Sequence, residues 1–281
     1  MSEALNLLAA PFAACLLMTM MLGYMGLHVL KRDVIFVDIA LAQFAAVGAI
    51  AAHFMLGVHA DSPAALALAW GATIIASAFY TLTRHFVPQI RLEAVIGISY
   101  AAAASAAMFL IAKGSSGHTH IQQMLTGNLL WVQWKDIALS SAVFALAGLI
   151  FWICHRPLHR ISDNYETTAR NGFGVMAWDF VFYALCGAVI TMAVRMAGVL
   201  VVFCYLIIPA TVSALFASKW LHRLLIVAAT GAVASVAGLT FAYTLDFSAG
   251  GSVSLFLGLA VAGSALVAHA RRRHQKSTAQ F

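Results

Sequence analysis

The chain has 281 residues, of which 63% are hydrophobic and 9% charged, and its mean hydropathy of +0.91 excludes a soluble globular enzyme. A formal net charge of +6 and a pI near 9.4 could indicate a nucleic-acid partner, but the placement of the charges favours a membrane. The four cysteines form no CxxC pair and indicate neither a zinc site nor a disulfide framework. We therefore predict an all-α, polytopic membrane protein.

Apolar runs that could cross a bilayer, which takes roughly 20 residues, recur along the whole chain. The first begins at Leu5 with no basic segment before it, so we expect a retained helix and not a cleaved signal peptide. The weakest division, at 195–198, is either a boundary between spans or a re-entrant turn, which gives eight or nine spans. The candidate spans are 7–30, 34–56, 64–83, 93–112, 137–154, 176–194, 198–217, 224–244 and 252–270.

Lysine and arginine are divided unequally between the two sets of connections: thirteen lie on one set and three on the other. Because basic loops are retained in the cytoplasm, the richer set is predicted to be cytoplasmic, and nine spans place the N-terminus outside. The basic tail 271–281 then faces lipid headgroups at the cytoplasmic side. We predict no nucleic-acid partner.

The segment 155–177, HRPLHRISDNYETTARNGFGVMA, stays polar between two apolar runs. Charged and unpaired backbone groups in hydrocarbon cost several kcal/mol each. We therefore predict an aqueous loop with a short helix near 162–172. Its role is either that of a solvated connector or that of a docking surface for a cytoplasmic partner.

Strongly polar side chains within the apolar runs are the default candidates for function, because burying them costs free energy. In the second run these are Asp38, Gln43 and His53. Asp38 follows Lys31 and Arg32 closely, so a position at the interface is the alternative to one inside the membrane.

Three further candidates lie in other runs: His28, Glu93 and Asp179. Glu93 and Asp179 begin their runs at the predicted cytoplasmic side, where the dipole of a helix N-terminus favours a carboxylate. We therefore expect structural roles for these two carboxylates.

The predicted outer loop GSSGHTH carries His118 and His120. Imidazoles at i and i+2 can share one divalent cation such as zinc, although two ligands do not complete a site and paired loop histidines are common without metal.

Pro209 lies in the middle of an apolar run, where it removes a backbone hydrogen bond and predicts a kink or a break. Thr211 and Ser213 follow it and can bond freed carbonyls or line a polar path. These three residues form either a packing kink or a gating element.

The sequence contains no GxxxxGK[ST], GxSxG or HExxH motif. Any ATP-driven step must therefore be supplied by another subunit, and we predict that the chain is not itself an enzyme.

Several stretches together resemble the membrane permease of bacterial ABC importers for zinc, manganese and iron. LTGNLL followed by Trp131 and AVRMAGVLVVFCYLIIPATVSALFA are the most specific of them, and the terminal LDFSAGGSVSLFLG resembles the last loop and helix of that family. The matching stretches are 31–52, 93–112, 120–136, 162–174, 193–217 and 245–258.

The resemblance implies one permease domain over 1–281, in a type II, vitamin B12-importer-like architecture in the inner membrane. It also implies a homodimer with the path between two copies, a cytoplasmic ATPase subunit docked on 155–177 and a periplasmic metal-binding protein that delivers the ion. No permanently bound cofactor is implied. The residues on or beside the coupling helix would be Asp163, Asn164, Tyr165, Glu166 and Gly172.

The sequence departs from the family pattern at the expected pore site. The family often carries Asp and His four residues apart in the second span, whereas Asp38 and Gln43 are five apart here. Five residues on an ideal helix place two side chains roughly 140° apart, unless a bulge intervenes. A carboxamide is also a harder ligand than imidazole and suits manganese or ferrous iron at least as well as zinc.

We interpret the chain as the membrane subunit of an ATP-driven importer of a divalent transition metal. Zinc and manganese are the first candidates for this metal, and iron is a further one. Asp38 and Gln43 are the expected pore residues, and His118 and His120 the expected residues of the outer mouth. The alternative is a stand-alone secondary transporter or channel, which would predict inverted repeats and paired interior charges. A membrane-embedded enzyme is a more distant alternative.

Overall fold

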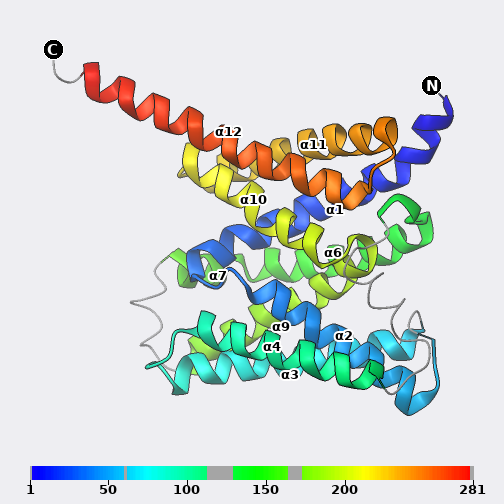
Figure 1. The fold of residues 1–281 in the computed structure, drawn as a ribbon. Helices are drawn as coiled ribbons and strands as arrows, with labels where there is room; N and C mark the ends of the chain where they lie inside the picture. Colours follow the sequence, from blue (N-terminus) through cyan, green and yellow to red (C-terminus); the bar gives the residue numbers. More distant parts are fainter. Residues whose placement is uncertain (1, 60–61, 113–128, 164–172, 279–281) are drawn as a thin grey trace.

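The computed structural model describes residues 2–59, 62–112, 129–163 and 173–278, and this part of the chain consists of helices joined by short turns, without a strand (Figure 1). The predicted all-α class is confirmed. The helices are α1 (Ser2–Arg32), α2 (Val37–Leu56), α3 (Pro63–Phe86), α4 (Leu92–Ala112), η1 (Leu129–Trp131), α6 (Trp134–Ile153), α7 (His155–Asp163), α9 (Phe173–Ala197), α10 (Val199–Phe216), α11 (Trp220–Leu245) and α12 (Ala249–Thr278).

Nine helices of the described residues are long and apolar enough to cross a membrane. They correspond to the predicted spans. The uncertain division near 195–198 separates two helices, because Gly198 has a φ of 82° and precedes α10. A residue with a side chain rarely adopts this backbone conformation, so a glycine at this position ends α9 and allows α10 to begin at once.

The spanning helices form two groups (Figure 1). In one group α1, α10, α11 and α12 pack against one another; in the other, α2, α3, α4 and α9 do so. The helix α6 contacts α1 and α9 and thus touches both groups, and α10 also packs against α2 and α9. One continuous core of buried apolar side chains extends through both groups.

The polar segment 155–177 begins with a helix, α7 (His155–Asp163), which lies before the helix predicted near 162–172. Most of that predicted helix lies outside the described residues, and α9 begins at Phe173. The apolar side chains of Leu158 and Ile161, three residues apart on α7, are buried, and α7 contacts α1, α6 and α9. A single apolar face was therefore sufficient for a helix within a segment that composition alone classifies as a loop.

Close helix packing in the first group depends on Gly26 of α1. A Cβ atom at this position would overlap the carbonyl oxygen of Leu206 in α10. We expect Gly26→Ala to lower the free energy of unfolding by about 1–3 kcal/mol, because α1 and α10 must move apart. Thermal unfolding in detergent measures this loss. Gly97→Ala is the control, since nothing lies within 4 Å of a Cβ there; an equal loss in both variants would contradict the prediction.

Candidate functional site

Asp38 lies in the first turn of α2 and is 1% exposed. Neither of its carboxylate oxygens makes a hydrogen bond among the described residues. The helix α2 packs here against α9 and α10, and Cys186 and Cys204 of those helices lie near the carboxylate. Sequence reasoning left both cysteines without a role. Asp38 is therefore a carboxylate enclosed by protein at the junction of three helices, in the first turn of α2.

Gln43 is also buried, at 8% exposure, on the same helix. The helix α2 is regular from Val37 to Leu56, so no bulge brings Gln43 round to the face of Asp38. The two side chains remain roughly 140° apart, as the five-residue spacing predicts. They therefore do not form one ion site within a single chain.

A complete metal cage is not present in the described ranges, which contain no group of three or more His, Cys, Asp or Glu residues that could hold an ion. His118 and His120, the other two predicted metal ligands, lie outside the described residues. The resulting candidate ion site is thus one buried carboxylate. A charged carboxylate in apolar surroundings costs free energy, and a bound cation lowers that cost.

Pro209 lies within α10, which continues from Val199 to Phe216 without ending at the proline. Thr211 Oγ1 donates to Ile207 O at 2.8 Å, and Ser213 Oγ donates to Ala210 O at 2.7 Å. Neither acceptor is the carbonyl of residue 205, which the proline deprives of its usual partner. Both hydroxyls are thus used within their own helix, and a role in gating stays a prediction.

One end of the bundle, here called the basic end, joins residues that are far apart in the sequence. Arg32, at the end of α1, donates from Nη1 to Asp179 Oδ1 of α9 at 2.5 Å, and both side chains are fully buried. His85 Nε2 of α3 lies 3.1 Å from Asp179 Oδ2, and Arg84 Nη1 donates to Tyr183 OH at 2.7 Å. The main interaction of Asp179 is therefore its ion pair with Arg32. The sequence predicted only a favourable interaction with the helix dipole.

Glu93 also has a more specific role than its predicted one. Its Oε1 atom accepts a hydrogen bond from Ile35 N at 3.0 Å. Ile35 belongs to the turn between α1 and α2, which leads into the first turn of α2. The carboxylate at the start of α4 therefore holds the segment that positions Asp38.

Asp163 is the one predicted coupling residue that the structure describes, and it forms an ion pair with Lys31 of α1. Asn164, Tyr165, Glu166 and Gly172 lie outside the described residues. Beside this pair, Lys31 Nζ lies 4.0 Å from the ring centroid of Trp220, the first residue of α11. His159 of α7 also packs against Trp220, with ring centroids 3.9 Å apart, so the start of the polar segment contacts both α1 and α11.

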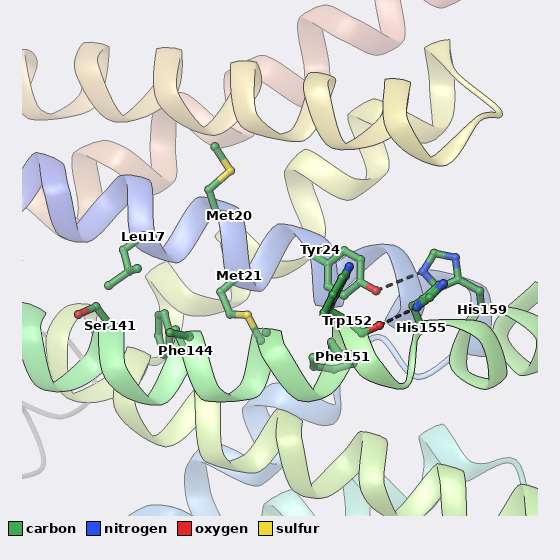
Figure 2. A pocket seen from close by; sticks show the side chains of 12 residues that line it. Leu17, Met20, Met21, Tyr24, Ser141, Phe144, Phe151, Trp152, His155 and His159 are labelled. Carbon is green, nitrogen blue, oxygen red and sulfur yellow. Dashed lines mark hydrogen bonds between the residues drawn. The ribbon is translucent and has the colours of Figure 1, made fainter.

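An open groove of about 660 Å³ runs between α1 and α6 (Figure 2). Its lining is mostly apolar, and His155 and His159 lie at the end of the groove near Tyr24. Tyr24 OH and His159 Nε2 are 3.2 Å apart, and burial lowers the pKa of His159. An apolar groove with two terminal imidazoles offers an ion far less than the carboxylate of Asp38, so we do not assign the ion path to it.

Comparison with known proteins extends this description. The chain is 26% identical over 195 residues to a probable metal transport system membrane protein of Chlamydia pneumoniae, covering 69% of this chain and 65% of that protein. It thus spans somewhat less than two thirds of the length of that relative. It is 25% identical over 233 residues to the manganese import system permease protein ScaB of Streptococcus parasanguinis, covering 83% of this chain and 80% of that protein.

Its fold resembles that of a chain in the solved structure of PsaBC from Streptococcus pneumoniae in complex with Fab. The TM-score is 0.75, with 22% identity and 93% of each chain covered. This likeness confirms the predicted permease architecture. The spanning helices and the bacterial relatives together identify a multi-pass bacterial membrane protein. Residues 4–268 match the ABC 3 transport family, and the chain therefore belongs to that family.

Proposed function

We propose that this chain is the membrane subunit of an ATP-driven importer of a divalent transition metal, with Asp38 on the ion path. The observation that carries the proposal is the buried Asp38 carboxylate, whose oxygens make no hydrogen bond among the described residues. Such a group is costly to keep in a membrane protein. A divalent cation that passes it would compensate the charge, and a single weak ligand also lets the ion leave.

Manganese is the ion that we propose first, with zinc and iron as alternatives. The carboxylate of Asp38 and the amide oxygen of Gln43 are hard ligands, which suit manganese better than they suit softer ions. The name of the streptococcal relative also refers to manganese import. Since Asp38 and Gln43 do not face one ion within a single chain, Asp38 is the residue that we place on the ion path.

The proposed partners are a cytoplasmic ATPase subunit on 155–177 and a metal-binding protein at the outer face. Support for the first comes from α7, which forms part of this segment and is attached to α1 through the Lys31–Asp163 ion pair. A movement imposed on α7 would therefore reach a spanning helix. The sorting of lysine and arginine supports a cytoplasmic position for this end.

The test is uptake of manganese, zinc and ferrous iron into vesicles that hold this chain with its ATPase and metal-binding protein. We expect ATP-dependent uptake of manganese, and none when the ATPase is left out. Glu166→Arg should abolish uptake while the chain remains in the membrane, because a reversed charge on the docking segment disfavours the ATPase contact. If the vesicles take up zinc or iron in preference to manganese, the assigned ion changes and ATP-driven import stands.

Uptake without the ATPase would support the alternative of a stand-alone secondary transporter or channel. Uptake that survives Glu166→Arg would instead remove the proposed docking role of 155–177 and leave ATP-driven import in place. The two outcomes thus test different parts of the proposal.

A further inference from the structure

Arg32 connects three other helices to the end of α1. Its Nε atom donates to Ser162 Oγ of α7 at 3.0 Å, and its Nη1 atom donates to Asp179 Oδ1 of α9 at 2.5 Å. Its carbonyl oxygen accepts a hydrogen bond from Arg84 Nη2 of α3 at 2.9 Å. Because Arg32 is 1% exposed, water does not compete for these contacts.

The hydroxyl of Ser162 bonds two side chains of α1. A guanidinium group can only donate, so Ser162 Oγ accepts from Arg32 Nε, and the same oxygen lies 2.9 Å from His28 Nδ1. Since His28 and Arg32 lie one helical turn apart on α1, the single hydroxyl of Ser162 attaches α7 to α1 at two points.

The short turn between α1 and α2 links Arg32 to Asp38. Asp33 has a φ of 55°, and Ile35 N donates to Glu93 Oε1 of α4. A left-handed residue and a hydrogen bond to another helix leave the turn little freedom. Asp38 follows directly, in the first turn of α2, so a displacement of Arg32 that carries this short turn with it also displaces Asp38.

We propose that Arg32 is a positioning residue that transmits movement of α7, the described start of the docking segment, to Asp38 through its contacts with Ser162 and Asp179. Figure 1 shows α7 beside the end of α1, and the two helices are in contact. The inference rests on the proposed ATP-driven import. It adds a specific route by which work done at the ATPase reaches the ion path.

The first test measures manganese uptake and ATP hydrolysis in the same vesicles, containing this chain, its ATPase and the metal-binding protein. Ser162→Ala removes the contact from α7 and leaves the Arg32–Asp179 ion pair intact. We expect ions transported per ATP hydrolysed to fall about 5- to 20-fold, with assembly and ATP hydrolysis preserved. Ser77→Ala should keep the ratio, because this buried serine donates to Thr73 O within its own helix.

The second test is the double variant Arg32→Met/Asp179→Leu. It removes both buried charges together, so neither is left uncompensated and the fold should persist. We expect the same fall in ions per ATP. An unchanged ratio in both Ser162→Ala and the double variant would overturn the inference. Parallel losses of uptake and hydrolysis would overturn it too, because a purely structural role gives that result. Absence of ATP-driven uptake by the unmodified complex would overturn the proposed function, and with it this route.

Discussion

Replacement of Asp38 by asparagine should reduce ATP-driven manganese uptake by about 100-fold or more, the upper range for groups that support a bound metal. Asparagine has nearly the same shape but no negative charge, so an ion beside this residue loses its counter-charge. The stability of the chain should be kept or raised, because the buried carboxylate makes no hydrogen bond among the described residues. Uptake into vesicles and thermal unfolding in detergent measure the two effects on the same preparation.

The matched control is Asp33→Asn, which makes the same chemical change in the turn before α2. Asp33 is exposed and has a φ of 55°, a conformation that asparagine tolerates about as well as aspartate does. Its variant should transport at the wild-type rate. If Asp38→Asn transports as well as Asp33→Asn does, the ion path lies elsewhere in the protein.

Loss of the Asp179 carboxylate should destabilise the fold more than any other single change considered for the basic end. Asp179→Ala leaves the guanidinium of Arg32 buried without its carboxylate partner, and breaking a buried pair in this way costs about 3–5 kcal/mol. His85 also loses an acceptor. Reversible unfolding of the purified chain in detergent and denaturant measures the loss in the free energy of unfolding.

Asp163→Ala is the comparison, because it removes the same group from an exposed ion pair. Lys31 and Asp163 are 22% and 41% exposed in their side chains, so this change should cost at most about 1 kcal/mol. Arg32→Met/Asp179→Leu should regain most of the stability lost in Asp179→Ala, because it leaves no uncompensated charge. Equal losses in Asp179→Ala and Asp163→Ala would show that burial does not set the strength of the Arg32–Asp179 pair.

The burial of Asp38 depends on tertiary packing that its place in the sequence does not reveal. Asp38 lies near Lys31 and Arg32 in the chain, and only the packing of α2 against α9 and α10 encloses its carboxylate. The angle between Asp38 and Gln43, by contrast, followed from their spacing on one regular helix. Geometry within a helix is local, whereas burial depends on the neighbours.

The sequence by itself determined the helical class, the spanning segments and the family resemblance. Length and apolarity of each run are local properties, and a bilayer admits few structures other than helices for such runs. Only the tertiary structure decided that Asp179 pairs with Arg32, 147 residues away, and that α7 is attached to α1 through Ser162. Such partners are selected by which helix ends meet in the folded bundle. No local pattern of hydropathy or charge encodes that choice.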